Sequence, residues 1–168
     1  ISSADGQVFL RAELFNEGIR PAVDSGVSVS RVGSAAQIKA MKQVSSSLKL
    51  ELAQFHEMES FAKFGSDLDA ATTEVLNQGE KVTQLLIQPQ YKPMPVEQQV
   101  LELFTSKYRY LKKVPAHLVQ KYEDGMISYI KREYPYIIDQ IRRDKALDNE
   151  LIAQTKTELD VWTQSFLK

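Results

Sequence analysis

The sequence has no cysteine among its 168 residues, which excludes disulfide bonds and thiolate chemistry. Its two histidines, His56 and His117, lie far apart in the chain, and we expect no metal site because a tetrahedral centre needs more ligands. No apolar run approaches the about 20 residues that span a membrane. Neither sign of charge prevails: 21 basic and 22 acidic residues give a formal net charge of -1, so we expect no nucleic acid and no direct membrane contact.

The motifs of self-sufficient enzymes are absent as well. The sequence contains no G-x-x-x-x-G-K-S/T phosphate loop and none of the patterns G-x-S-x-G, H-E-x-x-H or C-x-x-C. We therefore expect no catalysis by this chain alone, and the missing loop counts against a self-sufficient nucleotide-binding domain. The first residues, Ile1 to Gln7, carry no initiator methionine, basic leader or apolar signal segment. They suggest a piece of a longer or processed polypeptide.

Strand signals occur only in residues 1–33. Asp5-Gly6 is a turn signal, and the residues that follow, 7–10, predict a short strand. Residues 12–17 predict one or two helical turns that end at Gly18. In residues 27–30 valine and serine alternate, which is typical of a strand with two different faces.

From residue 34 the apolar period changes to that of a helix. Ser34 and Gln37 match a capping box, and apolar residues at steps of three and four predict one long helix to Gly65, with residues 45–47 as a weak point. Ser66 is expected to cap the next helix. The predicted helices beyond it are 68–78 with Gly79 after it, a short one to about 88, and 96–112, 116–133, 136–144 and 148–167, with a break at the prolines of residues 89–95.

Arg31 is the most informative polar residue. It leaves the end of a predicted strand beside Ser28 and Ser30 and precedes a predicted helix, a place where phosphates bind in α/β domains. Its guanidinium is planar, always charged and rich in donors, which suits phosphate oxygens. An ordinary ion pair with a surface carboxylate is the alternative, and the residues alone leave both open.

Two further groups of residues have a functional and an ordinary interpretation. Gln88 and Gln90 could donate to and accept from an adenine edge on which Phe15 stacks, or could simply belong to a loop beside proline. Asp67 and Asp69 could form an acid pair, or could favour the positive end of a helix that Ser66 caps.

A basic and aromatic stretch also has two interpretations. It resembles a binding patch, but the chain as a whole is not basic, and a solvated helix face explains it equally. The residues are Lys107, Tyr108, Arg109, Tyr110, Lys112 and Lys113.

Several long strings of the sequence resemble the α subunit of F-type, rotary, proton-driven ATP synthases. They are G-I-R-P-A at residues 18–22, G-V-S-V-S-R-V-G-S-A-A-Q at 26–37, I-K-A-M-K-Q-V at 38–44, L-K-L-E-L-A-Q at 48–54, F-A-K-F-G-S-D-L-D-A-A-T at 61–72 and Q-P-Q-Y-K-P-M at 88–94. The resemblance is dense to about residue 112 and looser beyond it.

This resemblance implies a mainly α chain. Residues 1–37 would be the last strands of an α/β, RecA-like nucleotide-binding domain, and residues 38–168 a helical C-terminal domain. In the family three α and three β subunits surround a rotating stalk and make ATP from ADP and phosphate, driven by a proton gradient. The implied partners are the remainder of the α subunit, the β subunits, the central stalk γ subunit and the peripheral stalk, with membrane contact only through the complex.

The resemblance also implies roles for individual residues. Arg31 matches the arginine that enters the catalytic site on the adjacent β subunit and neutralises charge on the transferred phosphoryl group, a contribution of about 10³–10⁵ in rate in comparable enzymes. Ser28, Ser2 and Gly6 match residues that line the same site.

A second implied site holds the adenine of a non-catalytic ATP or ADP with Mg²⁺, although the Mg²⁺ ligands do not lie in this segment. Its residues match Phe15, Arg20, Pro21, Gln88 and Gln90.

The resemblance places Ser66, Asp67 and Asp69 at the central stalk, as an exposed contact segment. The chain departs from the family at Gln54-Phe55-His56-Glu57, where Gln-Tyr-Arg-Glu is usual, at Ile87, and most of all beyond about residue 115. The string at 48–54 is nearer to mitochondrial members, which favours the matrix side of the mitochondrial inner membrane over the cytoplasmic side of a bacterial plasma membrane.

An alternative function comes from a different class of protein. A non-catalytic helical interaction module could keep the same strings, with Arg31 in an ordinary ion pair. A partner chain that carries the missing phosphate loop would distinguish the two.

Overall fold

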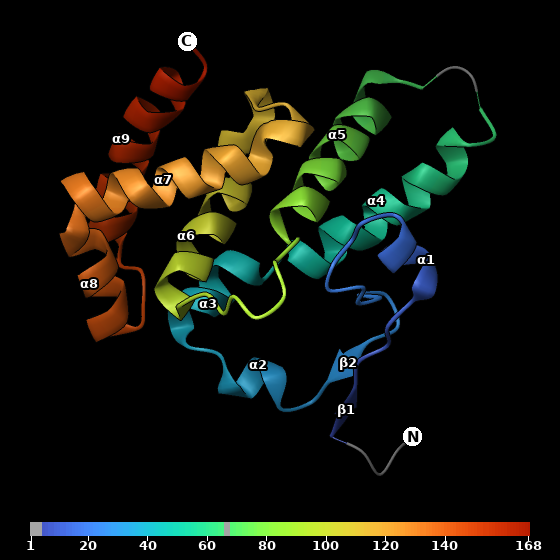
Figure 1. Cartoon of the computed structure of the whole chain (residues 1–168), viewed down its shortest axis with the longest axis horizontal. Helices are drawn as coiled ribbons and strands as arrows, with labels where there is room; N and C mark the ends of the chain where they lie inside the picture. Colours follow the sequence, from blue (N-terminus) through green and yellow to red (C-terminus); the bar gives the residue numbers. More distant parts are fainter. Residues whose placement is uncertain (1–4, 66–67) are drawn as a thin grey trace. The chain divides into compact units, whose positions relative to one another are not determined.

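The computed structural model describes residues 5–65 and 68–168, and the protein is mainly helical (Figure 1), as the sequence predicted. The elements are β1 Gly6–Gln7, α1 Ala12–Asn16, β2 Val29–Ser30, α2 Gly33–Ala36, α3 Lys39–Ser45, α4 Leu48–Ala62, α5 Ala70–Leu85, α6 Val96–Lys107, the 3₁₀ helices η1 Tyr110–Lys113 and η2 Ala116–Leu118, α7 Val119–Glu133, α8 Pro135–Asp144 and α9 Asn149–Phe166.

The chain forms two compact units. Unit 1 comprises Ile1–Gln37 and Ser47–Pro93, and unit 2 comprises Ile38–Ser46 and Met94–Lys168. The sequence-based boundary between residues 37 and 38 stays a prediction.

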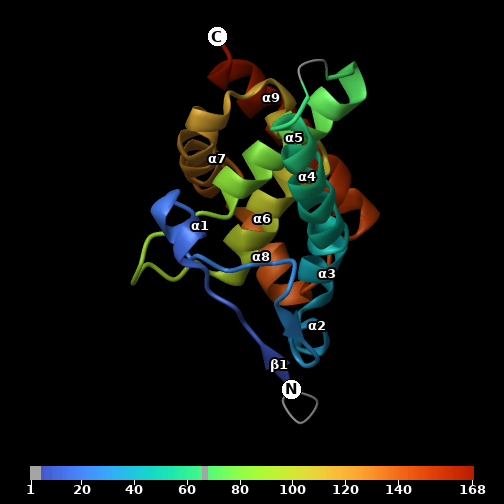
Figure 2. The same ribbon diagram turned by 90° about the vertical axis from the view of Figure 1, so that its right-hand side faces the viewer.

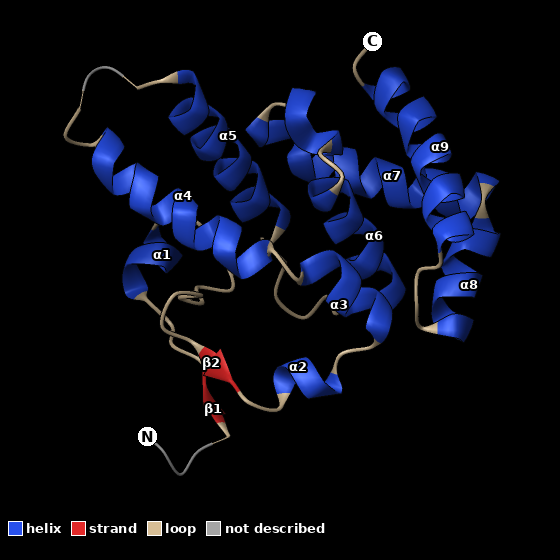
Figure 3. Ribbon diagram, turned by 180° about the vertical axis from the view of Figure 1, so that it is seen from behind, coloured by secondary structure: helices blue, strands red, loops and turns tan. Residues whose placement is uncertain are grey.

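Unit 1 contains the two strands that the structure describes, β1 and β2, drawn red in Figure 3. They pair antiparallel, with Gly6 opposite Ser30 and Gln7 opposite Val29, and a separate bridge joins Leu10 to Val23. A Cβ on Gly6 would lie 2.5 Å from the Val29 carbonyl oxygen, so glycine permits this close approach of the strands. The strands are shorter than predicted, at two residues each.

The helices α4 and α5 pack side by side in unit 1 (Figure 1). The prediction that a helix ends before Gly79 is wrong, because α5 continues through Gly79 to Leu85. Gly79 is buried against Phe55, and a Cβ there would lie 2.1 Å from the ring atom Cγ. Here glycine is a packing residue, and the close approach of two helices outweighs its weak helix propensity.

The predicted capping box is also wrong. Ser34 lies inside α2 and has no capping hydrogen bond, while Gln37 is extended (ψ 138°) and separates α2 from α3. The weak point in the predicted long helix is confirmed, since α3 ends at Ser45 and α4 begins at Leu48. The Ser45 hydroxyl donates to the Met41 carbonyl (2.8 Å), a bond that bends and weakens helices.

Unit 2 is a helical bundle in which α6 contacts α3, α7 and α8, and α7 contacts α9 (Figure 2). The helices predicted at 116–133, 136–144 and 148–167 are confirmed to within a few residues, with residues 116–118 forming η2, whereas the helix predicted for 96–112 ends at Lys107 and is followed by η1. Its largest fully buried side chains are Tyr122, Phe104, Leu101, Leu111, Met126, Ile130, Ile137, Ile141, Leu151 and Leu159.

Two buried carboxyl groups of unit 2 have opposite surroundings. Arg142 donates twice to Glu97 (2.6 and 3.1 Å). Burial opposes the charge of Glu97, but these bonds outweigh it and hold its pKa below the ordinary value. Complete burial raises the pKa of Glu123 well above its ordinary value, outweighing the opposing effect of the contact with Thr105, and the Glu102 and Asp124 carboxylates raise it further.

The Thr105 hydroxyl indicates the same protonation state for Glu123. Its oxygen lies 2.7 Å from the Glu102 carbonyl and 2.5 Å from Glu123 Oε1, yet it has one hydrogen to donate. A protonated Glu123 that donates to Thr105 Oγ1 satisfies both contacts.

We predict that Gly79→Ala lowers the free energy of unfolding by about 0.5–2 kcal/mol, since overpacking against Phe55 costs more than the gain in helix propensity. Urea unfolding of the full chain measures this. The exposed helical substitution Asn77→Ala serves as the control and should be neutral or stabilising. Phe55→Leu should rescue the variant, and no rescue would contradict the packing explanation.

We predict that Glu123→Gln has about the wild-type stability at pH 4 and becomes more stable than the wild type as the pH rises to 8. The folded chain holds the Glu123 proton more tightly than the unfolded chain does. This contribution is therefore complete below about pH 4.5 and is lost as the pH rises toward the raised pKa. Burial raises the pKa of Glu102 to about 7. Because both proteins contain this residue, it adds a similar dependence of stability on pH to each of them. Thermal unfolding across pH measures the difference, and a gap independent of pH would refute the buried proton.

Candidate functional site

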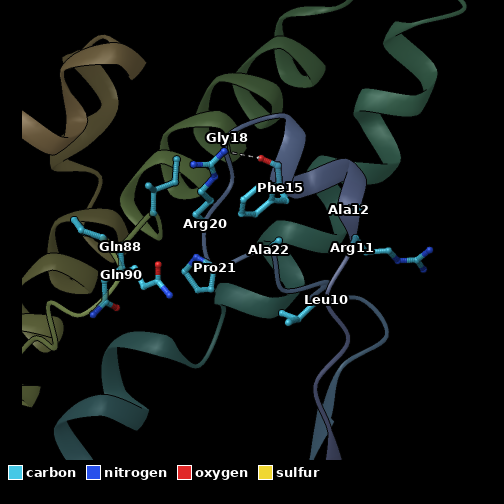
Figure 4. A pocket seen from close by; sticks show the side chains of 12 residues that line it. Leu10, Arg11, Ala12, Phe15, Gly18, Arg20, Pro21, Ala22, Gln88 and Gln90 are labelled. Carbon is cyan, nitrogen blue, oxygen red and sulfur yellow. Dashed lines mark hydrogen bonds between the residues drawn. The ribbon is translucent and has the colours of Figure 1, made fainter.

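A pocket of about 850 Å³ lies within unit 1 and brings together two segments far apart in sequence (Figure 4). All five residues predicted around an adenine line it. The complete lining is Leu10, Arg11, Ala12, Phe15, Gly18, Arg20, Pro21, Ala22, Ile87, Gln88, Pro89 and Gln90. Its volume falls in the range of small-molecule sites.

A backbone hydrogen bond joins the two walls of this pocket, and a side-chain hydrogen bond holds the loop of residues 88–92. The Gln88 N–H donates to the Arg20 carbonyl (2.8 Å), and the Gln88 side-chain amide donates to the Lys92 carbonyl (2.9 Å). Gly18 ends α1 with a φ of 86°, a conformation that glycine adopts without strain. Within the described part of the chain the Gln90 amide has no hydrogen-bond partner, so it is available to a ligand.

Arg20 and Phe15 form one stacked pair at the pocket. The Arg20 guanidinium carbon lies 4.0 Å from the centre of the Phe15 ring, and Nη2 donates weakly to the Phe15 carbonyl (3.5 Å, dashed in Figure 4). A guanidinium over an aromatic face is attracted by the ring quadrupole. Both residues line the pocket, where a planar cation and an aromatic ring can contact a flat heterocycle.

Arg11 has a different role from Arg20. In Figure 4 its side chain points away from Arg20, and its Nε donates to Asp24 (2.8 Å). Slight burial of Asp24 acts to raise its pKa. The hydrogen bonds from Arg11, Val27 and Gly26 outweigh this effect and lower the pKa of Asp24. This pair fixes the loop that follows β-bridge residue Val23.

Apolar residues in both walls of the pocket were missed from sequence. Leu10, Ala22 and Ile87 line it, but apolar residues carry no chemical signature. The one feature that could have indicated these residues is their position in the sequence, next to the segments that resemble the family.

Arg31 follows β2 directly and is exposed. Its backbone N–H donates to the Asp5 carbonyl (2.7 Å), which anchors the main chain. Among the described residues its guanidinium has no ion pair or hydrogen bond. The side chain therefore reaches into solvent from an anchored backbone.

The structure describes two of the other three residues predicted at that site, and their roles there stay predictions. The Ser28 hydroxyl accepts from the Phe9 N–H (3.0 Å) and so keeps its own hydrogen to donate. A glycine at position 6 is explained by packing, because a Cβ there would collide with the neighbouring strand β2. Ser2 lies outside the described residues.

Asp69 is the N-cap of α5. Its carboxylate accepts from the Thr72 N–H (2.6 Å), and this bond lowers the pKa of Asp69. The cap expected at Ser66 is therefore provided at Asp69, because α5 begins at Ala70. Ser66 and Asp67 lie outside the described residues. Beside them Phe64 is 93% exposed.

Residues 5–65 and 68–168 hold no group of three or more His, Asp or Glu side chains that could bind a metal ion. No helix in these ranges combines the length and apolarity that crossing a bilayer requires.

The family model described as ATP synthase alpha/beta chain, C terminal domain, matches residues 37–161. This range covers about three quarters of the 168 residues. The chain therefore belongs to the ATP synthase alpha/beta chain family and contains its C-terminal helical domain.

Proposed function

We propose that this chain is the C-terminal part of an α subunit of an F-type ATP synthase, which makes ATP from ADP and phosphate with the energy of a proton gradient. It would hold part of a non-catalytic adenine nucleotide and would supply Arg31 to the catalytic site of a neighbouring β subunit. The observation that carries the proposal is the convergence of residues 15–21 and 88–90 on one pocket.

The unit 1 pocket suits an adenine base. Among residues 5–65 and 68–168 the Gln90 amide has no hydrogen-bond partner, so it can donate to and accept from the base edge without breaking a bond described in the fold. Leu10, Ala22 and Ile87 provide apolar contacts, and the Phe15–Arg20 pair provides a planar stack. A bound nucleotide would supply phosphates and their Mg²⁺, but the residues of this pocket would hold the base.

Arg31 suits a role on another subunit. Its exposed guanidinium has no partner among the described residues, and an arginine of this kind stabilises charge on a transferred phosphoryl group. The anchored backbone of Arg31 limits where the side chain can reach. The sequence has no phosphate loop, so the phosphates would be held by the partner.

The proposed partners follow from this assignment, in which this chain supplies Arg31 and a partner holds the phosphates. They are the remainder of the α subunit, the β subunits, the γ subunit of the central stalk near Asp69, and the peripheral stalk. We place the complex on the matrix side of the mitochondrial inner membrane. Purification from the source tests this assembly: a copurifying chain with a phosphate loop supports it, whereas a lone monomer favours a purely structural helical module.

We predict that Arg31→Ala in the assembled enzyme lowers multisite turnover by about 10³-fold or more, while nucleotide binding persists. Steady-state hydrolysis and bound-nucleotide assays measure the two effects. Arg132→Ala, which removes an exposed arginine paired to Glu133, is the matched control and should turn over normally. Wild-type turnover in Arg31→Ala would refute the proposed role.

We predict that Gln90→Ala lowers the affinity of the non-catalytic sites for adenine nucleotide about 3–10-fold, the value of one or two hydrogen bonds. Retention of bound nucleotide by the purified complex measures this. The control is Gln54→Ala, an exposed glutamine on α4. Equal retention in both variants would exclude Gln90 from base recognition, and would leave the role of Arg31 untouched.

A further inference from the structure

A second pocket, of about 480 Å³, lies entirely within unit 2. Four cationic side chains and one carboxylate line it, although the whole chain has a net charge of -1. We call it the basic groove, and its lining residues are Tyr108, Arg109, Tyr110, Lys112, Lys113, Lys156, Asp160, Thr163, Gln164 and Leu167. Charge is concentrated here in a hollow, where the low-dielectric walls strengthen the local field.

The structure of the basic groove differs from what the sequence alone predicted. Residues 109–113 do not lie on a solvated α-helix, because Arg109 has a left-handed backbone (φ 64°) and η1 follows it. Lys107 is not among the lining residues, since its ammonium group donates to the Gln43 carbonyl. The fourth cation is Lys156 of α9, which the sequence places more than forty residues away.

Tertiary contacts hold Lys156 at the groove. The Tyr110 hydroxyl donates to the Lys156 carbonyl (3.0 Å) and ties η1 to α9. Burial and the nearby Asp160 carboxylate raise the pKa of Tyr110, so the phenol keeps the proton that it donates. The Lys156 ammonium lies 4.0 Å from the centre of the Tyr108 ring, a cation–π contact that positions the charge without neutralising it.

From these contacts we propose that the basic groove binds a compact anion with two or more phosphate groups. The four cations lie on one short turn and one facing helix, so their charge suits a small multivalent ligand. An extended acidic peptide would spread its carboxylates over a longer surface. Gln164 adds a neutral amide donor at the edge. The site is distinct from the unit 1 pocket and requires no adenine base.

Inorganic pyrophosphate is the probe, because it lacks the base that the unit 1 pocket would select. Titration calorimetry of the full chain at low salt should detect binding that weakens several-fold at physiological ionic strength. Lys156→Gln should lower the affinity about 3–10-fold, whereas Lys121→Gln, an equal charge change at an exposed α7 residue outside the groove, should leave it unchanged.

Asp160→Asn gives a test in the opposite direction. Removal of the only carboxylate among the lining residues should raise the affinity for pyrophosphate about 2–3-fold, a gain that misfolding cannot imitate. Circular dichroism verifies that each variant is folded. The proposal is overturned if pyrophosphate does not bind, or if Lys156→Gln and Lys121→Gln behave alike. Binding to phosphatidylcholine vesicles that contain phosphatidylglycerol, without binding to pyrophosphate, would also overturn it in favour of a lipid surface.

Discussion

The hydrogen bond from the Gln88 N–H to the Arg20 carbonyl joins the two walls of the unit 1 pocket. Its position depends on helix packing, because α5 ends at Leu85 and leads directly into this loop. Contact between Gly79 and Phe55 in turn fixes α5 against α4. A glycine that touches no ligand therefore helps to determine where the two pocket glutamines lie.

Arg11, Arg20 and Arg31 are close in sequence but differ in what surrounds the guanidinium. Arg11 is paired with Asp24 and supports the loop, and Arg20 is stacked on Phe15 at the pocket. Arg31 has an anchored backbone and no described side-chain partner. A paired guanidinium must lose its partner before it can bind an anion, whereas an unpaired one loses only water and side-chain entropy. This difference, which composition cannot show, makes Arg31 the best suited of the three to a ligand on another chain.

Sequence patterns predicted most of the helical residues in 96–167, since their apolar period is strong and Pro95, Pro115 and Pro135 precede three of the predicted starts. The patterns failed where local and tertiary signals conflict: Gly79 resembled a helix stop but is required by packing, and Ser34 resembled a cap but lies inside a four-residue helix. The five residues predicted around an adenine, all of which line the unit 1 pocket, were chosen by resemblance, since residue chemistry alone left the interpretation of Gln88, Gln90 and Phe15 open. Lys156 could not be predicted, because only the fold brings it to η1.

The two buried carboxyl groups of unit 2 show how the same residue type reaches opposite charge states. Glu97 lies at the edge of the bundle, where the Arg142 guanidinium reaches it from α8 and remains in water. Glu123 is surrounded by the bundle, is hydrogen-bonded to the Thr105 hydroxyl, and lies near the Glu102 and Asp124 carboxylates. A second charge there would be repelled and unsolvated, so binding a proton costs less than charging. The helical bundle is therefore stable with Glu97 ionised and Glu123 neutral. The difference arises because a cation, the Arg142 guanidinium, reaches the carboxylate of Glu97.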